Sequence, residues 1–228
     1  MARPPSKHSQ AGEVARFLQK QRAIRQFVDR SPRLMFAVDA TASRQPTWDM
    51  ACHLQSEMFS ATAPIAALSV QLCFYRGFRD FQASGWVNST ATLQALMSRV
   101  RCEAGQTQLQ RVLRHGLDEH ARVPVRALIF IGDAIEETPG SLLDLAGQCG
   151  LRKLPLFLFQ EGADASVRQT LQQMASLSGG AHCSFDQNSA GTLQELLGAV
   201  ARYAAGGRHA LQDDRSRGAR LLLSQMKD

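Results

Sequence analysis

The chain has 228 residues, of which 44% are hydrophobic and 20% charged, so the sequence predicts one globular domain with at most small additions. The formal net charge is +6, a surplus that would suit a nucleic-acid partner if it lay on one surface. Residues 1–33 carry eight basic and two acidic side chains, residues 34–206 carry thirteen and fifteen, and residues 207–228 carry five and three. The basic surplus therefore belongs to the two ends, and the central body is slightly acidic.

Several classes of protein are excluded by patterning. No apolar run approaches the roughly 20 residues of a membrane helix, and the N-terminus has no apolar signal core, so we expect neither a membrane protein nor a secreted one. The five cysteines are scattered, odd in number and without CxxC spacing, which argues against a zinc site and a disulfide framework. Buried reduced thiols are expected instead, and with them a cytoplasmic location.

In chain order, a polar start leads into an amphipathic helix over residues 13–29 with a basic outer face, which Ser31-Pro32 ends. Short apolar runs then alternate with helical patterns. We expect helices over residues 48–60, 92–100, 107–122, 141–149, 166–177 and 192–204, and a short one over 219–226. We expect strands over residues 34–38, 68–74, 78–83, 127–131, 154–159 and 181–185.

Fully apolar strands that alternate with helices indicate a parallel sheet covered on both faces. The sequence thus predicts an α/β fold: a doubly wound, mostly parallel six-stranded sheet with helices on both faces. Arg76-Gly77 can turn the chain back into residues 78–83, which makes that strand an antiparallel edge strand. The expected organisation is a basic tail and helix over residues 1–32, the α/β domain over 33–205, and a C-terminal tail with a short helix over 206–228.

The residues that follow the apolar runs suit a divalent cation. In such a sheet, ligands bind beyond the carboxyl ends of the strands, where the strand order reverses. Asp39 ends the first run and is followed by the hydroxyls of Thr41 and Ser43; Asp133 follows the fourth run, and Thr107 opens a helix. Two carboxylates and three hydroxyls are hard oxygen ligands of the kind that magnesium prefers. Caps of helices are the alternative explanation for Asp39, Ser43 and Thr107.

These motifs resemble the von Willebrand factor A (VWA) domain, the fold of the integrin I-domain, with its metal-ion-dependent adhesion site. That site combines D-x-S-x-S after the first strand, a Thr in a later loop and an Asp after the fourth strand. Asp39, Thr41, Ser43, Thr107 and Asp133 match these positions in order, with Thr41 where the family usually has Ser. Residues 105–109 and 178–182 are also similar to the family, and the resemblance covers about residues 33–204.

The resemblance implies a Rossmann-like fold and a bound magnesium ion, with manganese or calcium as alternatives. It implies an intracellular protein-interaction module that binds a partner's Asp or Glu through the ion. Family members without a secretion signal often work beside AAA+ ATPases or in multi-protein complexes, and the resemblance suggests such a role here. We expect no nucleic-acid binding, because Phe17 and Phe27 lie on the apolar stripe of the basic helix and serve packing.

A metal-dependent hydrolase or phosphotransferase that uses the same ion is the alternative function. No GxGxxG, GxxxxGK[ST] or GxSxG motif is present, so we expect a binding protein rather than an enzyme. Arg44 follows Ser43 directly and is expected beside the metal, where its charge would favour an acidic partner. Glu136 and Glu137 are expected in a solvated acidic loop, with the rim of the metal site as the alternative. Trp48 is expected to be partly buried against the sheet.

Overall fold

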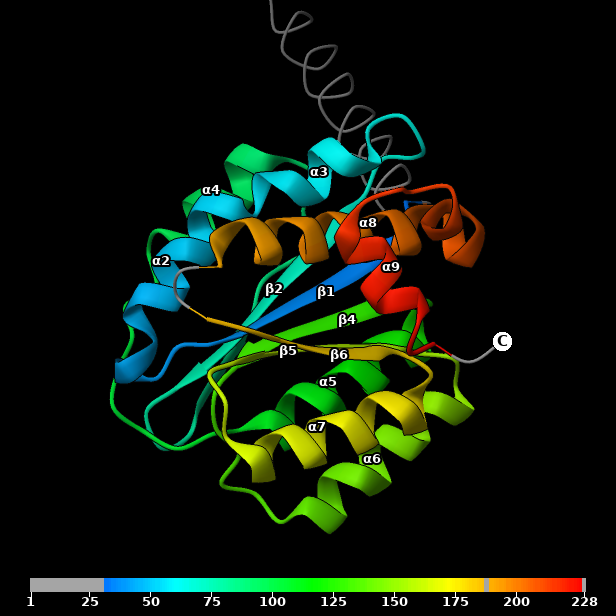
Figure 1. The fold of residues 1–228 in the computed structure, drawn as a ribbon. Helices are drawn as coiled ribbons and strands as arrows, with labels where there is room; N and C mark the ends of the chain where they lie inside the picture. The colour runs from blue at the N-terminus through cyan, green and yellow to red at the C-terminus, as the bar shows by residue number, and fades with distance from the viewer. Residues whose placement is uncertain (1–30, 187–188, 227–228) are drawn as a thin grey trace, which may run out of the picture. The chain divides into compact units, whose positions relative to one another are not determined.

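The computed structural model describes residues 31–186 and 189–226, so the helix predicted over residues 13–29 lies outside the described part of the chain. Six strands form one sheet in the order β3-β2-β1-β4-β5-β6 (Figure 1). Every neighbouring pair is parallel except β2 and β3, which are antiparallel, as predicted for the edge strand. The strands are β1 (Arg33–Asp39), β2 (Ser69–Arg76), β3 (Asp80–Ala83), β4 (Val125–Gly132), β5 (Leu156–Glu161) and β6 (Ala181–Phe185).

The central strands are apolar along their whole length because helices cover both faces of the sheet. In β1, Leu34 and Phe36 belong to one hydrophobic cluster, and Met35 and Ala37 belong to the other, as the two-residue period of a strand requires. All four side chains are fully buried. The short edge strand β3 is only partly buried, which is typical of a strand with one unpaired side.

Figure 1 shows α5, α6 and α7 on one face of the sheet and α2, α3, α4, α8 and α9 on the other. The helices are α2 (Gln45–Leu54), α3 (Ser56–Thr62), α4 (Thr90–Met97), α5 (Leu109–Arg122), α6 (Pro139–Leu151), α7 (Ala165–Ser178), α8 (Ala190–Gln212) and α9 (Arg217–Leu223). A 3₁₀ turn, Ala42–Arg44, precedes α2. None of the described helices is long and apolar enough to span a membrane.

Most predicted helices differ from the observed ones by up to three residues at an end, and two differ in a larger way. The helix predicted over residues 48–60 is two helices that meet at Gln55, and it begins earlier, since Pro46 is favourable in the first turn of α2. The helix predicted over residues 192–204 continues to Gln212 through a kink at Gly207, whose φ of 70° departs from helical geometry. Glycine adopts this left-handed region without steric cost.

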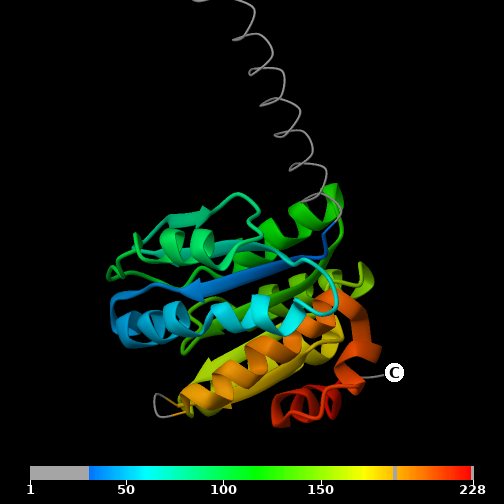
Figure 2. The same cartoon turned by 90° about the horizontal axis from the view of Figure 1, so that it is seen from above.

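The residues beyond Gly207 join the core of the sheet. α9 packs against α8 and β6 (Figure 2), and Ala219 and Leu222 are fully buried in the hydrophobic cluster that also contains Leu34 and Phe36 of β1. The predicted short helix over residues 219–226 is observed two residues earlier, after Ser216, whose hydroxyl caps it by accepting the Ala219 N–H.

The strand order reverses between β1 and β4. From β1 the chain first moves to β2 on one side and later returns to β4 on the other, with Val38 of β1 paired to Ile131 of β4. The carboxyl ends of these two neighbouring strands carry Asp39 and, one residue beyond the strand, Asp133. This is the crevice at which open α/β sheets bind ligands.

Candidate functional site

Asp39 is the most deeply placed member of the candidate site. It ends β1 and is only 1% exposed. Its Oδ1 accepts the Thr41 N–H at 2.8 Å, and its Oδ2 accepts the hydroxyl of Tyr75, the neighbouring residue on β2, at 3.1 Å. No basic side chain of the described residues forms an ion pair with it. Asp39 is therefore a buried carboxylate held by two neutral donors.

Burial raises the pKa of Asp39 above its ordinary value, and the charge of Asp133 raises it further. The hydrogen bonds from Thr41, through both its backbone and its side chain, and from Tyr75 act in the opposite direction. The fully buried Tyr75 responds in turn: burial and the nearby charge of Asp39 raise the pKa of its phenol. A carboxylate in this position lacks a counter-charge that a bound cation would supply.

Asp133 lies close to Asp39. A Cβ added at Gly132, the last residue of β4, would be in van der Waals contact with the Asp39 Cβ at 3.5 Å. Asp133 follows Gly132 and forms an ion pair with Arg44, whose Nη2 is 3.1 Å from Oδ2. The structure therefore brings the two predicted carboxylates to the same end of the β1–β4 pair, and it gives one of them a guanidinium partner.

Arg44 is the centre of a small charged network. Its Nη1 lies 2.5 Å from Glu161 Oε2, at the end of β5, and the hydroxyl of Thr47 in α2 also donates to that carboxylate oxygen. The Arg44 side chain is 11% exposed and that of Glu161 is 6% exposed, so both charges are largely out of water. Arg44 thus links the loop after β1 to the ends of β4 and β5.

Ser43 and Thr107 differ in their surroundings. Ser43 is exposed in the 3₁₀ turn, where its Oγ accepts a 3.4 Å hydrogen bond from Arg44 Nε. Thr107 is buried just before α5, and its hydroxyl donates to Glu137 Oε2 at 2.6 Å and accepts the Glu136 N–H at 2.8 Å. Glu137 also accepts the Gln110 N–H in the first turn of α5. Glu136 is exposed, as expected for a solvated loop, whereas Glu137 is partly buried beside Thr107, close to the alternative placement at the rim of the site.

The donor set of the five predicted ligands fits a hard divalent cation. Asp39, Thr41, Ser43, Thr107 and Asp133 offer oxygen atoms alone, and the carboxylates of Asp39 and Asp133 would balance a 2+ charge. Within the described residues no group of three His, Cys, Asp or Glu side chains could hold a metal, so hydroxyls would have to complete any ligand set here. In the structure Arg44 forms an ion pair with Asp133, and Glu137 accepts a hydrogen bond from the Thr107 hydroxyl.

Sequence reasoning missed three residues that contact this site. Tyr75 and Glu161 lie inside or at the end of buried strands, where a sequence shows only an apolar run. Thr47 lies in the first turn of α2, where it resembles an ordinary helix-start residue. Trp48 is more buried than expected, at 1% exposure, and its indole N–H donates to the Met97 carbonyl at 3.2 Å, so it serves packing rather than partner contact.

The fold is that of VWA domains. Similar solved structures include a von Willebrand factor type A protein from Catenulispora acidiphila (15% identity, TM-score 0.62, 77% of this chain and 43% of that one). They also include the BatB protein of Bacteroides thetaiotaomicron (15% identity, TM-score 0.55, 72% and 95%) and the SpRpn10 VWA domain (9% identity, TM-score 0.58, 72% and 95%). The chain thus spans less than half the length of the first of these.

No protein-family model and no curated protein matches the sequence. The likeness to solved structures therefore establishes the six-stranded, Rossmann-like VWA fold.

Proposed function

We propose that this chain is a protein-interaction module that binds a carboxylate of its partner through a divalent cation, with Asp39, Thr41, Ser43, Thr107 and Asp133 as the ligand residues. The observation that carries the proposal is the buried Asp39 carboxylate at the strand-order reversal, which has no described cation partner. The cation, magnesium or else manganese or calcium, would supply an open coordination position for an Asp or Glu of the partner.

The chain's own residues would prepare this position. Tyr75 and the Thr41 N–H hold both oxygens of Asp39 in place through hydrogen bonds, so its orientation is fixed before a cation binds. The hydroxyls of Thr41, Ser43 and Thr107 are neutral and would not cancel the charge of the cation. The cation would therefore attract a carboxylate of the partner. Arg44 acts as the counter-ion of Asp133 and competes with a bound cation for that carboxylate, since a guanidinium and a metal ion attract the same oxygens.

The role in a larger assembly rests on the sequence resemblance. We propose that the chain works in the cytoplasm as a subunit of a multi-protein complex, such as one that contains an AAA+ ATPase. The five cysteines are all free, which is consistent with a reducing compartment.

Metal binding is tested first, by calorimetric titration of the full chain with Mg²⁺ and Mn²⁺. Wild type should bind one ion, and Asp39→Asn and Asp133→Asn should weaken binding at least about tenfold, because each removes a charged ligand. Asp164→Asn is a matched control, since Asp164 caps α7 by accepting the Ser166 and Val167 N–H groups. Equal affinity in wild type and both site variants would refute the proposed ligand set.

Partner capture is tested next, from lysate of the source cells in Mg²⁺ or in chelator. The same protein should be retained by wild type in Mg²⁺ and lost both with chelator and with Asp133→Ala. Capture that survives chelation and the substitution would show that the interaction does not use the cation.

A further inference from the structure

A basic, partly aromatic surface lies beside the candidate metal site, and the proposed function does not yet use it. β2 and β3 are joined by a three-residue turn, residues 77–79, which we call the Phe78 turn. Phe78 is 74% exposed and is the only exposed aromatic side chain among the described residues. Aromatic side chains, Phe among them, are enriched at protein interfaces relative to the rest of the surface.

The Phe78 turn is fixed in place by the loop that carries Thr107. The Gly77 carbonyl accepts the Gln106 N–H at 3.1 Å and the Gln108 side-chain amide at 3.3 Å. Gly105 is so close that an added Cβ would lie 1.9 Å from the Gly77 oxygen. Gly77 itself has a φ of 55°, which glycine tolerates best. The exposed Phe78 is therefore presented on a rigid turn, next in space to a predicted ligand of the metal.

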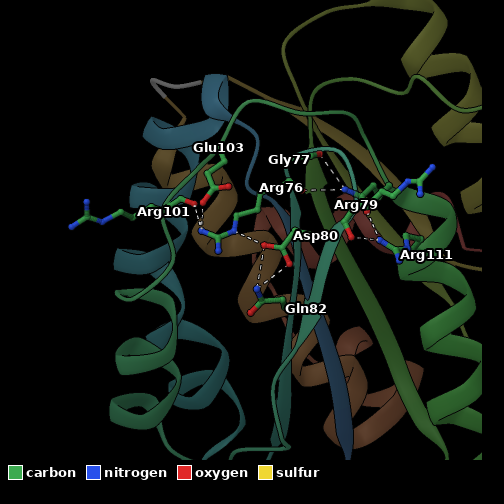
Figure 3. Close-up of polar contacts among 9 residues, drawn as sticks. Arg76, Gly77, Arg79, Asp80, Gln82, Arg101, Glu103 and Arg111 are labelled. Carbon is green, nitrogen blue, oxygen red and sulfur yellow. Dashed lines mark hydrogen bonds and ion pairs between the residues drawn. The ribbon is translucent and has the colours of Figure 1, made fainter.

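Arginines surround the turn (Figure 3). Arg76 is neutralised, since it lies 2.8 Å from Asp80 and 2.9 Å from Glu103. Arg79, Arg101 and Arg111 are exposed and form no ion pair with any described residue. Figure 3 shows Arg101 on the far side of Arg76 and pointing away from Arg79, so we give the name arginine cluster to Arg79 and Arg111 alone.

Arg111 lies in the first turn of α5, where the helix dipole disfavours a positive charge. Its guanidinium fastens the turn by donating to the Arg79 carbonyl at 2.7 Å. Glu137 already accepts the Gln110 N–H of this turn, so the positive potential of the surface comes from the arginine side chains. A surface with this potential complements carboxylates, which would be steered toward the adjacent metal site.

We infer that the Phe78 turn and the arginine cluster are a docking surface for an acidic segment of the partner protein, in which carboxylates pair with the arginines and an apolar side chain covers Phe78. The inference rests on the proposed function, because the same segment would deliver its Asp or Glu to the metal. A protein partner is favoured over single-stranded nucleic acid because Phe78 stands alone, whereas nucleic-acid surfaces stack successive bases on several aromatics.

The test uses random dodecapeptides displayed on phage, selected on the full chain in Mg²⁺. Selected peptides should combine two or more Asp or Glu residues with an apolar residue. Their affinities are then measured by fluorescence polarisation, and Phe78→Ser and Arg79→Glu should each weaken binding about tenfold, as loss of a central aromatic or reversal of a pairing charge does. Arg126→Glu should leave binding unchanged, because Arg126 is exposed at the start of the central strand β4, at the opposite end of the strands from Asp39 and Asp133.

Each outcome decides between the two proposals. Mg²⁺-dependent binding that is unaffected by Phe78→Ser and Arg79→Glu would overturn the docking surface and leave the proposed function intact. Binding that survives chelation and Asp133→Ala but falls with Arg79→Glu would overturn the metal-dependent function and keep the docking surface. Selection of peptides without acidic residues, or tighter binding of a single-stranded oligonucleotide than of any selected peptide, would overturn the inference.

Discussion

The guanidinium of Arg44 lies 3.1 Å from the carboxylate of Asp133, so a predicted metal ligand carries a protein counter-ion. The same guanidinium contacts Glu161, whose side chain is 6% exposed. The carboxyl end of the sheet thus offers two routes to neutralise its acids: an internal arginine and an external cation. The cation concentration would decide whether Arg44 or a bound cation neutralises Asp133. The position of Arg44 in the loop after β1 would then depend on that concentration too.

Arg44→Gln is expected to lower stability without metal and to tighten metal binding. Loss of the guanidinium leaves Asp133 and Glu161 without their counter-charge, which should cost about 2 kcal/mol of unfolding free energy, given that Asp133 is 29% exposed. The affinity for Mn²⁺ should rise about fivefold, because Asp133 no longer has a competing cation. Urea unfolding in chelator and calorimetric titration measure the two effects.

Arg114→Gln is the control for Arg44→Gln, since Arg114 is exposed at the surface of α5. It should change neither stability nor metal affinity measurably. If Arg44→Gln weakened Mn²⁺ binding instead, Arg44 would support the metal site rather than compete for it.

Glu137→Ala is expected to destabilise the start of α5. Gln108, the residue before α5, provides no side-chain cap, and Glu137 accepts the Gln110 N–H at 3.1 Å from across the loop. The substitution should therefore cost about 1 kcal/mol, as loss of a helix cap does. It also frees the Thr107 hydroxyl, so the metal affinity should not fall. Urea unfolding with Glu137→Gln as the conservative variant tests this, and equal stability of all three proteins would contradict it.

The sequence predicted the sheet well because burial on both faces leaves an apolar run that polar residues do not interrupt, as in Leu34–Val38. The juxtaposition of Asp39 and Asp133 was implied by the resemblance to the VWA domain, which has its first and fourth strands side by side, and the strand order confirms that β1 and β4 are neighbours. The sequence predicted that Arg44 lies near the candidate site only because Arg44 directly follows Ser43. Its partner Glu161 could not be found this way, because it is 117 residues distant and ends a strand that was expected to stop at Phe159.

The loop contacts of the site depend on tertiary packing that no local pattern encodes. Glu137 was assigned to a solvated loop because acidic side chains usually lie in solvent, but four hydrogen bonds join Glu136 and Glu137 to Thr107 and to the start of α5. The hairpin turn was expected at Arg76-Gly77 with Phe78 and Arg79 inside the edge strand, but β3 begins only at Asp80. The turn lies against the loop of Thr107 only because Gly105 has no side chain. The residues next to Gly105 in the sequence do not reveal this close contact, because its partner Gly77 is distant in the chain.

Gly105→Ala is expected to be among the most damaging single-methyl changes in the chain. The added Cβ would lie 1.9 Å from the Gly77 carbonyl oxygen, so the Phe78 turn or the Thr107 loop must move. We expect a loss of at least about 2 kcal/mol, as for other overpacked sites. Gly147→Ala is the matched control: it lies in α6 with nothing within 4 Å of its added Cβ, and it should gain about 0.5 kcal/mol. Thermal unfolding of both variants tests the pair, and equal behaviour would contradict the close approach.

His182 is expected to make stability fall in mild acid. It is 5% exposed in β6, its Nε2 lies 3.2 Å from Gln160 Oε1, and burial with the nearby Arg168 lowers its pKa from 6.5 to about 4. Because the unfolded chain takes up a proton near pH 6.5 and the folded chain only near pH 4, the unfolded state binds more protons in between. The contribution of His182 is therefore fully present above pH 6.5 and is lost progressively as the pH falls toward 4, by roughly 2–3 kcal/mol.

The variant His182→Gln isolates this effect, since glutamine keeps a polar group near Gln160 and cannot gain a charge. The difference in unfolding free energy between wild type and variant should shift in favour of the variant between pH 6.5 and pH 4, and stay constant above pH 7. His115, whose pKa burial also lowers, contributes equally to both proteins and cancels in the difference. Chemical denaturation at half-unit steps of pH measures the profile, and parallel curves for the two proteins would show that His182 is protonated normally in the folded state.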